Sequence, residues 1–206
     1  MAVCDSEAYI FFVYPLRPCS RSPSFALRRL WTRNTTMRFL DTTTGRFIDG
    51  DPRHAEYGYY AILSHTWDRN GEQSFQDLNK IQERYTQTDS PADGKLSYCF
   101  YCRFSAQSNH IAPEFSIWDD PDLSPKIRDA CKVARANGFN LIWIDSCCID
   151  KSSSAELSEA INSMYAWYAA ARVCYAYLVD VPRDDDHRAE GSRFRQSLWF
   201  KRGWTL

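Results

Sequence analysis

The sequence predicts an α/β fold in which helices flank a parallel sheet. Apolar runs of strand length take turns along the chain with segments of helical periodicity. Within each run the apolar residues are nearly continuous and do not alternate with polar ones. Continuous runs are typical of strands covered on both faces, and strand–helix–strand order favours parallel pairing through right-handed crossovers. With 206 residues, of which 44% are hydrophobic and 25% charged, the chain is long enough to bury a substantial core.

Three strands and three helices are predicted in alternating order. The strands are the apolar runs at residues 59–64, 139–144 and 173–179. The helices are the segments of helical periodicity near residues 75–81, 125–137 and 153–168.

Start and stop signals support the second and third helices. Ser124 and Pro125 suit the cap and first helical positions of the second helix, and Gly138 ends it. Ser153 and Glu156 have the spacing of a capping box at the start of the third. The large apolar residues of that helix form one stripe: Leu157, Ile161, Met164 and Tyr168. This stripe predicts the face that packs on the sheet.

Two segments are predicted to lie outside this alternation. Residues 1–36 hold five arginines and two acidic residues, and we interpret them as a disordered tail, a transit peptide or the product of a misplaced start codon. Met37 then opens the domain, which runs over residues 37–206. Residues 82–122 are polar without a sustained period, and predict a long insertion that is either mobile or functional.

Charge and cysteine usage exclude several classes of protein. The net charge of -1 argues against a nucleic-acid-binding protein, which needs a basic excess. No apolar run reaches the roughly 18 residues of a membrane span. Eight cysteines without a signal peptide favour free thiols in a cytoplasmic protein over a secreted disulfide framework.

Polar residues follow the first two predicted strands. Ser64, His65 and Trp67 follow the first strand, and Asp145 follows the second. Because open parallel sheets bind ligands at the carboxyl ends of their strands, we expect these side chains to line a cleft. His65 suits either acid–base chemistry or hydrogen bonding to its neighbours. Trp67 suits either stacking on a planar ligand or packing against the sheet edge.

Two cysteine pairs have alternative interpretations. Cys147 and Cys148 suggest a thiolate nucleophile, but core packing is favoured because no oxyanion motif accompanies them. Cys99 and Cys102, with His110 nearby, have the spacing of half a zinc site. A structural zinc site needs four ligands and no second pair is present, so no metal site is predicted.

Several blocks of the sequence, in order, resemble the heterokaryon-incompatibility (HET) domain of filamentous fungi. The blocks begin with YAILSHTW at residues 60–67 and WIDSCCIDK at residues 143–151. They continue through residues 153–168 and CYAYL at residues 174–178, and end with WFKRGWTL at residues 199–206. The family-motif residues are Cys148, Trp199, Arg202, Gly203 and Trp204. The matches also add Asp150 and Glu156 to the candidate functional residues.

This resemblance implies a signalling module in fungal non-self recognition, which triggers programmed cell death when genetically different cells fuse. It implies partners by self-association or among other incompatibility and sensor proteins. The family has been likened to Toll/interleukin-1 receptor (TIR) domains, which implies a flavodoxin-like parallel sheet here. The chain has Asp68 where the family often has glycine, which puts that loop's geometry in doubt.

The TIR likeness also implies an alternative chemistry. Some TIR domains cleave NAD with a glutamate, so NAD is a possible substrate although no cofactor is expected. In HET domains the segment starting at Trp204 usually continues Gln-Glu-Leu, which places the equivalent glutamate beyond Leu206. A domain truncated before this glutamate is expected to lose most NAD cleavage, so an inactive HET fragment is a third reading.

Overall fold

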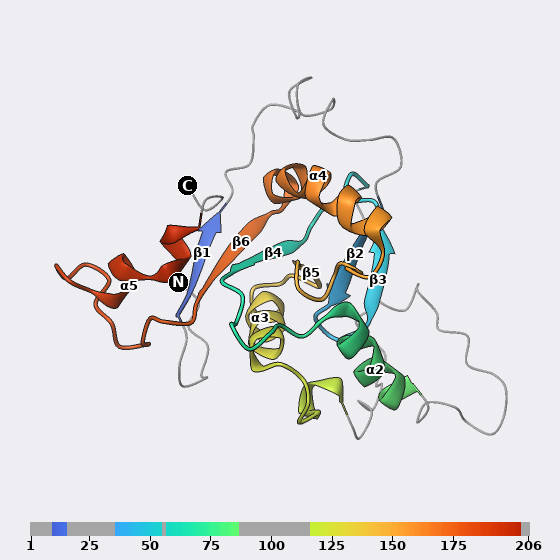
Figure 1. Ribbon diagram of the computed structural model, residues 1–206, viewed down its shortest axis with the longest axis horizontal. Coiled ribbons are helices and arrows are strands. Elements are labelled where there is room, and N and C mark those ends of the chain that lie inside the picture. The colour runs from blue at the N-terminus through green and yellow to red at the C-terminus, as the bar shows by residue number, and fades with distance from the viewer. Residues whose placement is uncertain (1–9, 16–35, 55–56, 87–115, 203–206) are drawn as a thin grey trace, which may run out of the picture.

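A computed structural model describes residues 10–15, 36–54, 57–86 and 116–202 and contains a six-stranded sheet (Figure 1). The strands are β1 (Ile10–Pro15), β2 (Met37–Asp41), β3 (Phe47–Gly50), β4 (Ala61–His65), β5 (Leu141–Ile144) and β6 (Val173–Leu178). The α-helices are α2 (Phe75–Thr86), α3 (Pro125–Ala136), α4 (Ser154–Ala170) and α5 (Arg193–Gln196). The described residues also form two 3-10 helices, η3 (Ile117–Asp119) and η4 (Leu198–Lys201). The predicted α/β class is confirmed.

The sheet is parallel at its centre and antiparallel at its sides. In the order β1-β6-β4-β5-β2-β3, β4 pairs in parallel with both β5 and β6. β1 pairs antiparallel with β6, and β2 pairs antiparallel with both β3 and β5. The expected parallel sheet is therefore correct for the three strands that the sequence predicted, and the added strands are antiparallel. A short turn through Gly45, whose φ is +68°, joins β2 and β3, and so short a connection allows only antiparallel pairing.

The helices cover both faces of the sheet. In Figure 1, α4 lies on one face, and α2 and α3 lie on the other. The chain crosses from β4 to β5 in one direction and from β5 past β4 to β6 in the other. Crossovers between parallel strands are right-handed as a rule, and two of them that run in opposite directions place their helices on opposite faces. Every residue of β4 and β5 is buried as a result.

The buried face of α4 differs from the predicted stripe at Ile161, whereas Leu157, Met164 and Tyr168 pack against the core as predicted. Ile161 is 63% exposed, whereas Ala160, Ser163 and Trp167 are buried. The small residues Ala160 and Ser163 let the helix lie close to the sheet, while Trp167 packs against Trp143 at 5.4 Å between ring centroids. This packing rotates Ile161 toward solvent, so the prediction for that residue was wrong.

Two predicted boundaries also need correction. β1 belongs to the sheet although it lies within residues 1–36, because its backbone pairs with the outer edge of β6. α2 extends to Thr86, and Ile117 is buried in the core, so both ends of the predicted insertion at residues 82–122 are structured. The cysteine pair of the half zinc site lies outside the described residues.

Candidate functional site

A cluster of charged side chains surrounds His65 at the carboxyl ends of the central strands. His65 is the last residue of β4, and Asp145 directly follows β5. The Nε2 atom of His65 lies 3.6 Å from Oδ1 of Asp145 and 3.7 Å from Oε2 of Glu72. The imidazole is fully buried. We call these side chains, together with Trp67, Lys126 and Lys151, the strand-end cluster.

Three cations hold the backbone and carboxylates around this imidazole. Lys126 donates to a carboxylate oxygen of Glu72 and, at 3.2 Å, to the carbonyl of Thr66. Lys151 donates to the carbonyls of Asp145 and Ser146 at 2.8 and 2.6 Å. The guanidinium of Arg202 donates to the carbonyl of His65.

The environment shifts the protonation of the cluster. Burial, with Lys126, Arg202 and Lys151, lowers the pKa of His65 to about 3, so the imidazole is neutral at pH 7. Burial raises the pKa of Asp145, although the Trp67 hydrogen bond and nearby cations oppose this shift. Burial also lowers the pKa of Lys151. The cluster therefore combines a neutral imidazole with a carboxyl group whose proton affinity is increased.

Several buried polar atoms of this region lack a hydrogen-bond partner among the described residues. They are both ring nitrogens of His65, Oδ1 of Asp145 and the hydroxyl of Ser146. Buried polar atoms are normally paired, and unpaired ones are common at functional sites. A small polar group that donates and accepts hydrogen bonds would satisfy His65 and Asp145 together.

Trp67 connects the cluster to solvent. Its side chain is 43% exposed, and its indole nitrogen donates to Oδ2 of Asp145 at 3.1 Å. The ammonium of Lys151 lies 4.9 Å from the centre of the indole ring. The site thus presents an aromatic surface beside a carboxylate and an ammonium. Such a surface suits a planar ligand or a partner side chain.

Ser64 supports the site without facing the imidazole. Its hydroxyl accepts a hydrogen bond from the indole nitrogen of Trp199 at 3.1 Å, and both residues are buried. Together with the Arg202 contact to His65, this bond ties the segment after α5 to β4. The motif residues Gly203 and Trp204 lie outside the described residues.

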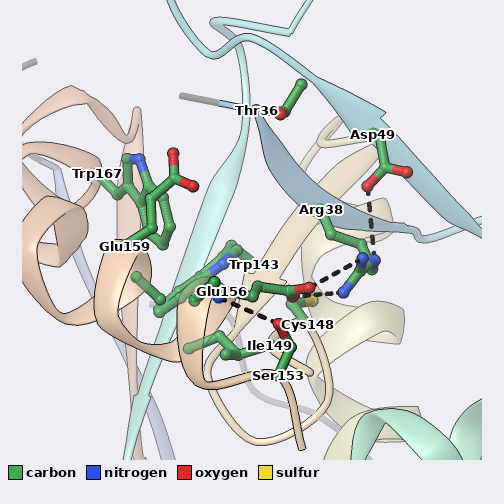
Figure 2. A pocket seen from close by; sticks show the side chains of 12 residues that line it. Thr36, Arg38, Asp49, Trp143, Cys148, Ile149, Ser153, Glu156, Glu159 and Trp167 are labelled. Carbon is green, nitrogen blue, oxygen red and sulfur yellow. Dashed lines mark hydrogen bonds and ion pairs between the residues drawn. The ribbon is translucent and has the colours of Figure 1, made fainter. Parts of the chain in front are cut away.

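Asp150 and Glu156 do not join the strand-end cluster. Asp150 caps a turn by accepting from the backbone and hydroxyl of Ser152 at 2.9 and 2.6 Å. Glu156 forms an ion pair with Arg38 at 2.6 Å (Figure 2). It also accepts from the backbone of Asp150 at 2.7 Å. The Ser153 hydroxyl accepts from the backbone of Glu156 at 3.3 Å, so that part of the predicted capping box is confirmed. The carboxylate of Glu156 binds Arg38 and the backbone of Asp150 and does not complete the capping box.

The paired cysteines belong to the core. Cys147 and Cys148 are buried, and the Cys148 sulfur accepts from the backbone of Ile144 at 3.4 Å. A hydrogen bond to Cys148, together with burial, raises the pKa of Cys147 well above its usual value. A high pKa disfavours the thiolate, which confirms the packing interpretation. No cluster of three metal-ligating side chains occurs among the residues that the structure describes.

Sequence reasoning did not name Lys151 as a candidate, and it missed Glu72 and Lys126 entirely. Both side chains are largely buried, at 7% and 11% exposure, yet neither lies in a strand-end motif. One signal was available for Lys126, which is the second residue of α3. A cation there opposes the helix dipole, and an unfavourable charge of this kind indicates a role elsewhere.

Comparisons with known proteins identify the family of this chain. Residues 60–190 match the family described as heterokaryon incompatibility protein (HET), and the match includes the whole strand-end cluster. The chain is 39% identical over 153 residues to the vegetative incompatibility protein HET-E-1 of Podospora anserina. That alignment covers 71% of this chain but 9% of the relative.

Two further findings bear on the predictions. No solved structure matches the chain, so its likeness to TIR domains stays a prediction. Among the described residues, no helix has the length and apolar character needed to cross a membrane. The family match covers more than half of the chain. The chain therefore belongs to the heterokaryon-incompatibility (HET) family.

Proposed function

We propose that this chain is a signalling module of fungal heterokaryon incompatibility, and that it triggers programmed cell death after non-self recognition. The observation that carries this proposal is the strand-end cluster, which lies within the family match and reaches solvent through the half-exposed ring of Trp67. The chain spans 9% of the length of its Podospora relative. That this module works as part of a larger assembly is therefore also a proposal.

The module acts by contact with a partner, either a second copy or another incompatibility or sensor protein. Exposed apolar side chains support this role, because they provide contact area outside the core. Ile161 and Tyr165 are 63% and 73% exposed and lie four residues apart on the outer face of α4. The four described cysteines are unpaired, which supports action in the reducing cytoplasm.

Expression in a filamentous fungus tests the proposal. We expect the unaltered chain to cause growth arrest or death, and Trp67→Ala to abolish it because the exposed part of the site is lost. Tyr59→Ala is a matched control, since Tyr59 is a similarly exposed aromatic residue, at 54%, outside the cluster. Killing by a folded Trp67→Ala protein would contradict a role for the strand-end cluster. Absence of killing by the unaltered chain would favour an inactive fragment.

Cleavage of NAD at the same cluster is a second candidate function. Trp67 offers a ring for stacking on a planar base, and Lys126, Lys151 and Arg202 supply positive charge around His65. Water adds to the ribose carbon as nicotinamide leaves, and one proton is released. The Asp145 carboxylate would stabilise the oxocarbenium-like charge that develops on the ribose. No step requires a cofactor.

Measurements of NAD turnover separate the two functions. The unaltered chain, Asp145→Asn and a version extended through the Gln-Glu-Leu segment would be assayed at oligomer-forming concentration. The enzyme proposal expects turnover that Asp145→Asn reduces, because the amide cannot stabilise positive charge. If no version consumes NAD while expression still kills cells, NAD cleavage is excluded and the signalling module stands.

A further inference from the structure

The segment at residues 193–202 packs as a small unit at the β6 side of the sheet (Figure 1). It comprises α5 and η4, each of four residues, and its apolar side chains form a cluster separate from the main core. The members of this cluster are Ala176, Leu178, Val181, Phe194, Trp199 and Phe200. So small a cluster belongs to the least stable part of a structure, and the segment can detach while the main core stays folded.

One carboxylate fixes the point from which η4 starts. Asp180 lies just after β6 and accepts from the hydroxyl of Ser197 and from the backbone of Leu198, both at 2.7 Å. The Ser197 hydroxyl in turn accepts from the backbone of Trp199 at 3.2 Å. These bonds direct the residues that follow toward the end of β4.

Two side chains of this segment reach the strand-end cluster through the backbone and hydroxyl of β4. The indole nitrogen of Trp199 donates to the hydroxyl of Ser64, and the guanidinium of Arg202 donates to the carbonyl of His65. Neither ring nitrogen of His65 hydrogen-bonds to a described residue. The imidazole is therefore oriented by packing and by whatever holds its backbone, which gives these two contacts a direct influence on it.

We propose that residues 197–202 act as a clip on the strand-end cluster, in which Trp199 and Arg202 are positioning residues. While the clip is docked, it holds the end of β4 and keeps His65 between Asp145 and Glu72. When the clip detaches, Ser64 loses a donor, the carbonyl of His65 loses its cation, and water reaches the end of β4. A partner that binds the clip would thus control a site that it does not touch. Only the biological effect of this control rests on the proposed function.

The protonation of His65 reports whether the clip is docked. The charged and titratable side chains around the imidazole are Glu72, Lys126, Asp145, Lys151, Tyr177 and Arg202. Burial and the three cations keep the imidazole neutral, whereas the two carboxylates favour its protonation. Detachment removes Arg202 and admits water, so the pKa of His65 rises from about 3 toward its ordinary value of 6.5. Because the detached form binds this proton more tightly, acidic pH favours detachment.

A pair of matched arginine variants of the full chain tests the clip. Arg202→Gln removes the contact to His65, and Arg195→Gln makes the same change at an exposed position that does not face the imidazole. In an acid titration of the histidine ring resonances by NMR, His65 should protonate about one pH unit higher in Arg202→Gln than in the unaltered protein. Arg195→Gln should titrate as the unaltered protein does, and Arg202→Lys should restore most of the shift. Equal titration of Arg202→Gln and Arg195→Gln would overturn the proposal.

Trp199→Phe separates the hydrogen bond from the packing. The phenyl ring keeps apolar contact with the small cluster but has no N–H group for Ser64. Detachment should become more frequent, so the backbone amides of residues 197–202 should exchange hydrogen about fivefold faster, the size expected for one hydrogen bond. The amides of β5 should be unaffected. Equal acceleration in β5 would mean that the whole fold is weakened, which contradicts a clip that detaches by itself.

Expression in a filamentous fungus distinguishes this inference from the proposed function. Arg202→Gln should weaken killing, and Arg195→Gln should not. If the unaltered chain does not kill, the proposed function fails, while the NMR titration still decides whether the clip exists. Equal killing by Arg202→Gln and the unaltered chain would exclude control of the site by the clip. Killing that is lost in Arg202→Gln without a change in the His65 titration would also overturn the inference.

Discussion

At pH 7 the imidazole of His65 is neutral, although carboxylate oxygens lie 3.6 and 3.7 Å from its Nε2 atom. Those carboxylates favour the protonated form, but burial and three nearby cations outweigh them. Lys126 already neutralises Glu72, which weakens its influence on the imidazole. His65 is therefore poorly suited to take up a proton in this state. Asp145 is the better candidate for proton exchange in the strand-end cluster.

The depressed pKa of His65 makes stability depend on pH. The unfolded chain binds this proton near pH 6.5 and the folded chain only near pH 3, so stability falls as pH decreases through that window. Between pH 7 and 5 the loss is about 2 kcal/mol in the free energy of unfolding. Between the same two pH values, the free energy of unfolding of His65→Gln should fall by about 2 kcal/mol less than that of the unaltered protein. Urea titrations of both proteins at pH 7 and pH 5 measure this difference.

Two comparisons make this result specific to His65. The raised pKa of Asp145 acts in the opposite direction, since its folded form protonates first, but it is present in both proteins. His54→Gln is the control, because the His54 side chain is 72% exposed. If His65→Gln and the unaltered protein lost equal stability, the pKa assigned to His65 would be wrong.

The sequence predicted some of the cluster's geometry but not all of it. Neighbouring parallel strands end at the same edge of a sheet, so placing His65 and Asp145 at two strand ends was enough to bring them together. Glu72 and Lys126 arrive from a loop and a helix, whose path depends on tertiary packing. The hydrogen bond from Trp199 to Ser64 spans most of the domain and has no local signal.

Among the elements, α4 depends on a single hydroxyl for its start. Ser153 accepts from the backbone of Glu156, which satisfies one of the free amides of the first turn. Ser153→Ala should lower the free energy of unfolding by about 1 kcal/mol, measured by urea denaturation. Ser154→Ala, one residue later and exposed, should change it by a few tenths at most. Equal effects of the two substitutions would contradict the capping role.

Elements with strong local signals were predicted, and others were not. β5, β6 and α3 fall within a few residues of their predicted ranges, because continuous apolar runs, Pro125 and Gly138 are unambiguous signals. The β2–β3 hairpin was missed, since its short strands include charged residues such as Arg38 and Asp49. Of the stripe predicted for α4, Leu157, Met164 and Tyr168 do pack against the core, and only Ile161 was misplaced.

For the whole molecule, β1 decides whether β6 is an edge strand. All six residues of β1 pair with β6. A chain that begins at Met37 would leave the outer side of β6 unpaired, and unpaired edges promote aggregation. We expect that truncation to unfold at lower urea concentration and to associate in size-exclusion chromatography. A chain that lacks only residues 1–9 keeps β1 and is the control. Equal stability of the two truncations would exclude a structural role for β1.

The pairing of β1 with β6 also sets an order of events during synthesis. Ile10 lies opposite Leu178, so β1 leaves the ribosome and waits for a partner made roughly 170 residues later. At about 5–20 residues per second, that interval lasts on the order of ten to thirty seconds. β1 can thus join the sheet only after β6 has been translated, although β1 precedes the central strands in the chain.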